Sequence, residues 1–496
     1  MVSDPAESIE PTTPSGRVRG ESATADSLWS TRRRALTIGL ILNVTIVASE
    51  ALAVGTILPI VAGDLGGIDL YGWVFSGFFL GSLLGIVVAG IVIDRGSLVR
   101  PFVAGIGLFS LGLLIGGLAP SMAVLVAGRV IQGFGAGAIP AVAYVSIGRA
   151  MPEPLRPRMF ATLSTAWILP GVIGPVAASA VAALLHWRLV FLGLLPFIAV
   201  AAWLTLPAIR AVAPTPPQDE PAARAAAARH RSVLPLAAVL VVGSGLIVAG
   251  LSRLGPAPLL EIAAGAMIGI PAFARLTPRG TIVAATGLPA AILLRGFLTF
   301  AFFSADAYVP LAIQDWRGDS ALLSGLAYMA ATLTWTGGSW VNAHRIQQLG
   351  PGRFLRAGFV VLLCGIVAFM AIFVRGVPTW LAVPLWGVAG FGMGLAYATP
   401  SLIVLREAPS ADQGAATAAL QLSDVLGSSL GTGIGGALIV LGSPAGRTGV
   451  EGLLATFVLA AGIALAGLLI TRRLGPRVAA GRPPEAVAPK TEPAPA

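Results

Sequence analysis

The segment Gly128-Arg129-Val-Ile-Gln132-Gly133-Phe-Gly135-Ala-Gly137 places one arginine inside an apolar stretch, Met122 to Ile147, that is long enough to cross a bilayer. A charge at that depth costs several kcal/mol, roughly 2.5–3.5 on insertion scales, so it normally faces the interior of a helix bundle and has a function. Arg129 therefore predicts a membrane protein whose helices enclose a functional charge.

The composition of the whole chain is typical of a membrane protein. Of its 496 residues, 56% are hydrophobic and 11% charged, which leaves too few polar side chains to cover a soluble protein. About fourteen apolar runs come near the ~20 residues that a spanning helix needs, at 35–60, 70–93, 101–119, 122–147, 159–185, 187–208, 233–252, 256–274, 284–311, 321–343, 354–374, 379–405, 414–441 and 450–471. These runs are longer than barrel strands and do not alternate in polarity. We predict an all-α polytopic membrane protein.

The distribution of the basic residues along the chain indicates its orientation in the membrane. A net charge of +10 would suggest a nucleic-acid partner in a soluble protein. If the N-terminus is cytoplasmic, however, 25 of the 32 Lys and Arg fall on cytoplasmic segments, five on outer ones, and two, Arg129 and Arg295, within spans. This positive-inside bias predicts two cytoplasmic termini, the bilayer as a partner, and no nucleic-acid partner. Since 31 of the 32 are Arg and Ala and Gly abound, we expect a GC-rich bacterial source and its inner (plasma) membrane.

Polar interruptions divide the spans into six, two and six. The predicted organisation is a disordered cytoplasmic N-terminus (1–34), a six-helix bundle (35–208), a cytoplasmic linker (209–232), two extra transmembrane helices (233–280), a second six-helix bundle (281–472) and a disordered cytoplasmic tail (473–496). The first apolar run is long enough to span, so we expect it to remain as a helix. The single cysteine, Cys364, excludes an intrachain disulfide.

The two six-helix segments repeat one another. Gly133-Phe-Gly135-Ala-Gly137 recurs 257 residues later as Gly390-Phe-Gly392-Met-Gly394, and the same offset takes Arg149 to Arg406 and Gly174 to Gly431. Internal duplication is how many transporters build a central site between two rocking halves. Arg129 falls on Trp386 at this offset, so its charge has no counterpart. A purely structural charge would more readily be kept in both halves, which favours a functional role.

Several segments resemble the signature motifs of the major facilitator superfamily, specifically its drug:proton antiporters with fourteen transmembrane helices. They are Glu50 to Pro59 in the first helix, Gly90-Ile-Val-Ile-Asp94-Arg95 after the second, Arg129-Val-Ile-Gln132-Gly133-Phe-Gly135 in the fourth, Gly174-Pro175 in the fifth and Trp187-Arg188 before the sixth. The family usually has Asp at position 50 and an arginine at position 98, whose role Arg100 could take over. The resemblance spans roughly residues 35–472. It implies a major facilitator fold of two pseudo-repeated six-helix bundles with two extra central helices.

Three charged residues within spans are the candidates for proton coupling: Glu50, Arg129 and Asp306. Glu50 lies near the middle of the first span, where a carboxyl can load and lose a proton because burial penalises its charged form. The alternative is a protonated, hydrogen-bonded packing acid. Asp306 shares a helix face with Phe302 and Arg295 and is a second titratable or substrate-contacting acid, or else a hydrated residue at a helix end.

Polar and aromatic stripes at helical spacing predict the wall of a substrate cavity. One stripe is Thr417, Gln421, Asp424 and Ser428, and another is Tyr328, Thr332, Trp335 and Ser339. Aromatic and hydroxyl groups suit an amphiphilic substrate, and a nearby carboxylate suits a cationic one. The predicted cavity residues are Asn43, Gln132, Trp167, Arg295, Tyr328, Trp335, Gln421 and Asp424. Helix packing is the alternative for each of them.

Two further groups of residues are candidates for gating. Asp94, Arg95 and Arg100 lie between the second and third helices, and His344 and Arg345 lie at the matching place in the second half. We expect charge contacts there that hold one access state, and simple solvation is the alternative. In the fifth helix Gly171, Gly174 and Pro175 allow a close helix approach and a bend, for packing or for gating.

Together these patterns predict a proton-coupled secondary transporter that exports amphiphilic small molecules, such as drugs or toxic compounds, by alternating access. We expect a monomer with no cofactor other than the proton gradient and no metal. The alternatives are export of a lipid, a glycolipid or one endogenous metabolite and, in another class, a non-transporting sensor or scaffold. An enzyme is excluded, because the three histidines are scattered and no Walker A, nucleophile-elbow or His-Glu-x-x-His pattern occurs.

Overall fold

The computed structural model describes residues 27–31, 33–212, 220–253, 256–409, 412–442 and 449–474. Within these ranges the regular structure is entirely helical, which confirms the predicted all-α class. The predicted disordered segments 1–34 and 473–496 lie largely outside the described residues. Part of the predicted linker 209–232 also lies outside them, and helix α10 begins at Glu220, before that segment ends.

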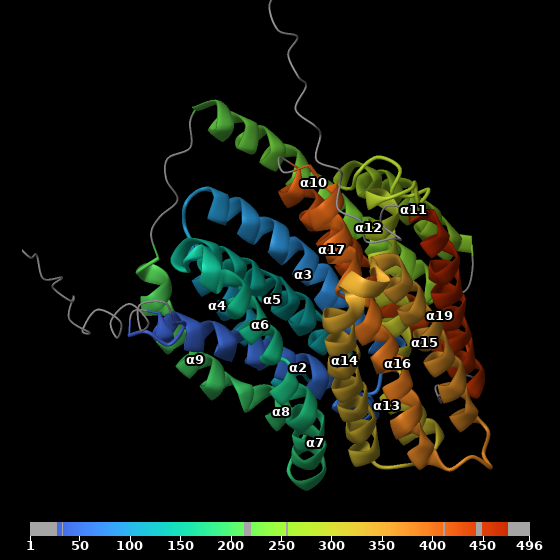
Figure 1. Ribbon diagram of the computed structural model, residues 1–496. Coiled ribbons are helices and arrows are strands. Elements are labelled where there is room, and N and C mark those ends of the chain that lie inside the picture. The colour runs from blue at the N-terminus through green and yellow to red at the C-terminus, as the bar shows by residue number, and fades with distance from the viewer. Residues whose placement is uncertain are drawn as a thin grey trace, which may run out of the picture.

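The first group of helices, blue to green in Figure 1, lies on one side of the molecule. It comprises α2 (Arg34–Leu65), α3 (Tyr71–Asp94), α4 (Val99–Gly117), α5 (Met122–Ala150), α6 (Arg156–Thr165), α7 (Ile168–Leu184), α8 (Arg188–Leu192) and α9 (Leu194–Arg210). Helices α3 and α4 both pack along α5, and α2 packs against α7 and α9.

The second group, yellow to red in Figure 1, repeats this arrangement on the other side. It comprises α12 (Leu288–Asp306), α13 (Val309–Leu311), α14 (Ala321–Leu349), α15 (Pro351–Phe369), α16 (Ala382–Ala396), α17 (Thr399–Glu407), α18 (Gln413–Leu441) and α19 (Val450–Ile470). Here α14 and α15 both pack along α16, as α3 and α4 pack along α5.

Twelve helices in the described part of the chain are long and apolar enough to cross a membrane. Two of the fourteen predicted spans are not among them, because α7 has only 17 residues and α14, although 29 residues long, carries many polar side chains. The predicted span 159–185 is interrupted between α6 and α7. Pro170 has no N–H to donate to the carbonyl of Ala166, and the hydroxyl of Thr45 donates to that carbonyl instead, over 3.2 Å. The count of fourteen stays a prediction.

The repeated glycines explain the helix packing within each half. A Cβ on Gly133 or Gly137 would collide with the backbone of α3, and one on Gly135 would collide with α4. Alternate glycines of α5 therefore face different neighbours and let both come close. The second half repeats these contacts, with Gly390 and Gly394 against α14 and Gly392 against α15.

Two further helices, α10 (Glu220–Leu251) and α11 (Pro256–Leu276), pack on each other beside both halves. Helix α10 contacts α3 of the first half and α18 of the second. A buried cluster joins Leu240 of α10 and Phe273 of α11 to Leu83 of α3 and Val425 of α18. The two helices thus cover one side of the contact between the halves.

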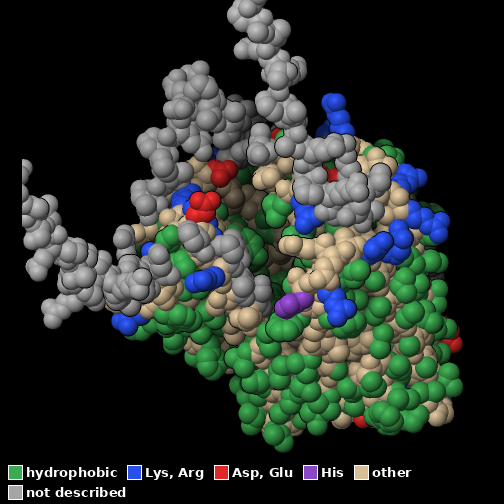
Figure 2. Space-filling model, in the orientation of Figure 1, with side chains coloured by type: hydrophobic (Ala, Val, Ile, Leu, Met, Phe, Trp, Pro, Cys, Tyr) green, Lys and Arg blue, Asp and Glu red, His purple; other side chains and the backbone are tan. Residues whose placement is uncertain are grey.

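The two halves touch at the end where α3 begins. A Cβ on Gly72 would lie 2.8 Å from the Cα of Gly436, so the backbones of α3 and α18 are in direct contact. Tyr308 donates a hydrogen bond of 2.5 Å to the carbonyl of Thr432, and its ring packs on that of Tyr71. At the other end the surface is hollowed between the halves, beside many of the basic side chains (Figure 2). The structure is closed at one end and open at the other.

Candidate functional site

Glu50 and Arg129 form a buried ion pair between α2 and α5. The Nη1 atom of Arg129 donates to Glu50 Oε1 and, over 2.8 Å, to Gln132 Oε1. Its Nε donates over 3.1 Å to the carbonyl of Val74 in α3, and its guanidinium lies 4.3 Å from the centre of the Phe78 ring. Glu50 is 0% and Arg129 3% exposed, so this is the pairing that two charges at bilayer depth require.

The glycine packing described above places this arginine. Helices α3 and α5 meet in a parallel register, in which Gly133 faces Phe78 and Gly137 faces Ser82. Arg129 lies one turn before Gly133, and Val74 lies one turn before Phe78. The close approach therefore brings the arginine to a carbonyl of the neighbouring helix.

One oxygen of the buried carboxyl is left without a partner. Glu50 Oε2 accepts no hydrogen bond from the described residues, and Gln132 Nε2 donates none, although both atoms are buried. Buried polar atoms in proteins are nearly always satisfied. Oε2 is thus an unsatisfied buried oxygen beside the Arg129 pair.

Asp306 lies at the corresponding place in the second half. Its Oδ1 accepts a hydrogen bond of 3.0 Å from the indole N–H of Trp386, and its backbone carbonyl accepts one of 2.7 Å from the hydroxyl of Tyr328. Trp386 is fully buried and stacks on Phe302, with 5.4 Å between ring centres. Asp306 is therefore held by aromatic donors.

Arg295, which the sequence places on the same helix face as Asp306, pairs with Asp424 of α18. Arg295 Nε lies 2.8 Å from Asp424 Oδ1, and Nη1 donates to the carbonyl of Tyr397. The guanidinium lies 3.3 Å from the centre of the Tyr397 ring, whose hydroxyl donates to Asp424 Oδ2 over 3.3 Å. Two predicted cavity residues thus form a second buried ion pair.

The other predicted cavity residues are dispersed. Asn43 is buried between α2 and α9, where its Nδ2 donates to the carbonyl of Gly39 and to Thr205 Oγ1. Trp335 is half-buried and meets Phe302 edge to face. Trp167 and Gln421 are exposed, and Trp167 lies at the interruption between α6 and α7. Of these, Trp335 lies with the aromatic side chains around Asp306.

The predicted gating residues lie at helix ends and in α7. Asp94, Arg95, Arg100, His344 and Arg345 are all exposed, at the ends of α3 and α14 and the start of α4. The ring of His344 lies tilted against that of Trp340, with 4.6 Å between ring centres.

In α7, Gly171 meets the side chain of Thr332 in α14, across the two halves. Gly174 has more room, with its nearest neighbour being the carbonyl of Ser49, 3.8 Å from an added Cβ. The carbonyl of Pro175 accepts a hydrogen bond of 2.8 Å from Ser179 Oγ. The predicted close approach therefore occurs at Gly171.

Two residues of this site were not among the predicted ones, Trp386 and Tyr397. The repeat offset that carries Arg129 to Trp386 is a signal for the first, since it marks a position equivalent to a functional one. Nothing in the sequence singles out Tyr397. In the part of the chain that the structure describes, no cluster of His, Cys, Asp or Glu could hold a metal ion.

The fold is that of known transporters. A peptide transporter POT solved with sulfate superposes with a TM-score of 0.66 at 14% identity, covering 93% of this chain and 99% of that one. A bacterial homolog of the human lysosomal transporter Spinster, solved inward-facing and unoccupied, superposes with a TM-score of 0.64 at 15% identity, covering 92% and 99%.

The chain is also similar in sequence to known transporters and matches a family model. A Mycobacterium tuberculosis protein named "Probable multidrug-efflux transporter" is 26% identical over 451 residues, covering 87% of this chain and 93% of that protein. The multidrug efflux pump SdrM of Staphylococcus aureus is 25% identical over 422 residues, covering 82% and 90%. These relatives are transporters, which agrees with the prediction that the chain is not an enzyme. Residues 36–432 match the Major Facilitator Superfamily, and this membrane-spanning chain belongs to that family.

Proposed function

We propose that the chain is a proton-coupled exporter of amphiphilic small molecules, drugs or toxic compounds among them, that works as a monomer by alternating access. We place it in a bacterial inner membrane with both termini in the cytoplasm. The names of its relatives support drug efflux. The clustering of basic residues supports the orientation.

The observation that carries this proposal is the Glu50–Arg129 pair. A buried acid that forms one hydrogen bond to an arginine and has one free oxygen can exist with or without a proton. Protonation removes the attraction between the two side chains, so proton uptake is coupled to a change in charge inside the bundle.

Two features support alternating access. The halves meet through Gly72 and Gly436 at one end and are separated by a hollow at the other, which is the geometry of one access state. The Arg295–Asp424 pair and the α5 and α16 glycine contacts lie within single halves, so each half can move as a unit.

We also propose that α7 and α14 cross the bilayer, which completes fourteen spans. They pack against each other at the contact between the halves, through Gly171 and Thr332. Polar side chains on α14 are tolerated at bilayer depth when they face protein or a water-filled cavity. Tyr328 and Trp335 of α14, together with Asp306, would then contact an amphiphilic substrate.

The test is proton-linked dye movement in proteoliposomes. The purified chain is reconstituted, a pH gradient is imposed, and ethidium movement and internal pH are followed together. Glu50→Gln, which keeps the shape and removes the titratable group, is expected to abolish the exchange. Glu451→Gln, which changes an exposed acid at the start of α19, serves as the matched control and is expected to transport as the parent does.

The outcomes separate the alternatives. Equal flux in the parent and in Glu50→Gln would remove Glu50 from the mechanism and leave Asp306 as the next acid to test. No dye movement and no proton flux in the parent would exclude drug export. Lipid or single-metabolite transport would then be assayed in its place.

A further inference from the structure

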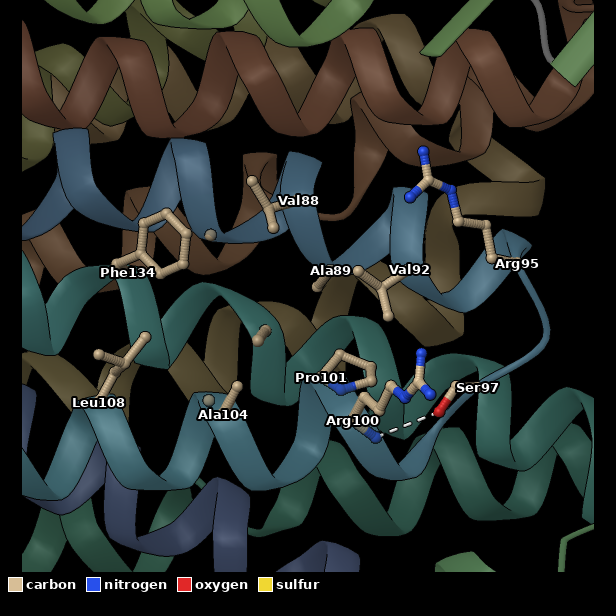
Figure 3. Close-up of a pocket in the computed structure, with 13 residues that line it drawn as sticks. Val88, Ala89, Val92, Arg95, Ser97, Arg100, Pro101, Ala104, Leu108 and Phe134 are labelled. Carbon is tan, nitrogen blue, oxygen red and sulfur yellow. Dashed lines mark hydrogen bonds between the residues drawn. The ribbon is translucent and has the colours of Figure 1, made fainter. Parts of the chain in front are cut away.

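A cavity of about 270 Å³ lies between α3, α4 and α5, away from the contact between the halves. Val88 and Val92 of α3 face Ala104 and Leu108 of α4 across it (Figure 3). Phe134 and Ala138 of α5 form its floor. Its lining is apolar along most of its length.

The packing of the three helices explains why this cavity exists. Helices α3 and α4 each lie close against α5 but touch each other little. The glycines of α5 hold them on two different sides of that helix, since Gly133 and Gly137 face α3 while Gly135 faces α4. A groove is therefore left between α3 and α4, with α5 beneath it.

The groove is open towards the bilayer. Ala104 is exposed although it lines the cavity, and its neighbours Val103 and Gly107 on α4 are exposed as well. In a membrane such a surface is covered by hydrocarbon. At about 270 Å³ the space lies just below the range of about 300–1,000 Å³ typical of drug-sized ligands, and an elongated apolar chain suits it better than a compact molecule.

One end of the groove is positively charged. Arg100 extends from the start of α4 beside Pro101 and Ser97, at the turn that follows α3 (Figure 3). Arg95 lines the same end with its stem but directs its guanidinium away from Arg100. Both side chains are exposed, and Asp94 is the acidic residue of this turn, so the segment 94–100 has a net positive charge.

We infer that this groove binds an anionic phospholipid, with an acyl chain between α3 and α4 and the phosphate at Arg100. The charged end of the groove lies on the side of the membrane that carries most of the arginines. Phosphate groups of the lipids in that leaflet would lie at the same level. Basic pockets between transmembrane helices on that side are typical sites for anionic headgroups. The inference does not depend on what the chain transports.

The test measures lipid binding directly, without transport. The purified full chain in detergent is titrated with phosphatidylglycerol and with phosphatidylcholine of the same acyl chains, and bound lipid is counted by native mass spectrometry. We expect tighter binding of phosphatidylglycerol. Arg100→Gln should weaken it about fivefold, the effect of one arginine near a membrane surface. Arg353→Gln, at an exposed arginine near the start of α15, is the charge-matched control.

A second pair of variants tests the acyl chain. Ala104→Phe fills the groove without changing the charge and should abolish the phosphatidylglycerol preference, whereas Val103→Phe adds the same bulk outside the cavity lining and should leave it unchanged. Equal binding of the two lipids by the parent, or an unchanged preference in both Arg100→Gln and Ala104→Phe, would overturn the inference. So would displacement of the lipid by ethidium, which would assign the groove to substrate entry.

Discussion

Trp386 stands in the second half where Arg129 stands in the first, and each side chain holds the acid of its own half. Trp386 donates to Asp306 over 3.0 Å, and Arg129 donates to Glu50. Asp306 follows Glu50 by 256 residues and Trp386 follows Arg129 by 257. The two halves therefore keep the same pair of positions, but only the first half keeps an ion pair there.

The hydrogen bond from Trp386 is expected to stabilise the second half. Trp386→Phe removes the indole N–H from a buried acid and should lower the free energy of unfolding by about 1.5–3 kcal/mol, the usual contribution of a hydrogen bond to a charged group. Trp335→Phe is the control, because it is the same change at a tryptophan whose ring also packs against aromatic neighbours, Phe302 and Tyr397. Thermal unfolding in detergent compares the two. Equal losses would mean that ring packing, and not the N–H, matters at Trp386.

Variants of the Glu50–Arg129 pair should affect stability and transport differently. Arg129→Leu leaves a buried acid without its partner and is expected to cost about 3–5 kcal/mol of stability. The double variant Arg129→Leu/Glu50→Gln removes both charges and should recover most of that loss, while proton-linked transport stays absent. Thermal unfolding and proteoliposome flux are measured on the same preparations. A double variant as unstable as Arg129→Leu would contradict this.

Substitution by alanine at the α7–α14 contact should impair transport at Gly171 but not at Gly174. A Cβ at Gly171 would meet Thr332, with the Cβ of that threonine only 2.8 Å away. Gly171→Ala should therefore reduce transport severalfold. Thr332→Ala removes the Cγ2 atom that would lie 2.0 Å from the new Cβ and should restore part of the transport, since the Cβ of residue 332 remains. Gly174→Ala has room and gains about 1 kcal/mol of helix propensity, so it should transport normally. The measurement is dye flux in proteoliposomes, and failure of Thr332→Ala to rescue would place the effect elsewhere.

The closed end should open when bulk is added at its glycine contact. Gly72→Val places side-chain atoms against Gly436 and should separate α3 from α18. In a Cys364→Ser background, a cysteine introduced at the fully buried Ser429 should then react faster with a maleimide. Gly63→Val is the control, because a Cβ there meets nothing within 4 Å. Unchanged labelling in Gly72→Val would show that this contact does not close the end.

Twelve of the fourteen predicted spans correspond to helices long and apolar enough to cross a membrane, because the length of an apolar run is a local property. The helical segments lie close to the predicted ones in order and position, and even the repeat of Gly133 at Gly390 corresponds to repeated contacts. What the sequence could not supply is which faces meet. Asp424 and Arg295 are 129 residues apart, and only the packing of α12 on α18 pairs them. At the interruption before α7, likewise, the carbonyl that Pro170 leaves free accepts from Thr45 of another helix.

Arg129 is fixed to α3 through Val74 and Phe78, by contacts that do not involve the charge of Glu50. If Glu50 carries the proton, as we propose, its protonation therefore leaves the guanidinium in place without its counter-ion. The wall of the first half then carries an uncompensated positive charge. For a cation about 10 Å away, at an effective dielectric constant of about 20, the repulsion is about 1.7 kcal/mol, or roughly fifteenfold in occupancy. Under this proposal, the hydrogen bond from Arg129 to Val74 would make arrival of the proton itself disfavour a bound cation.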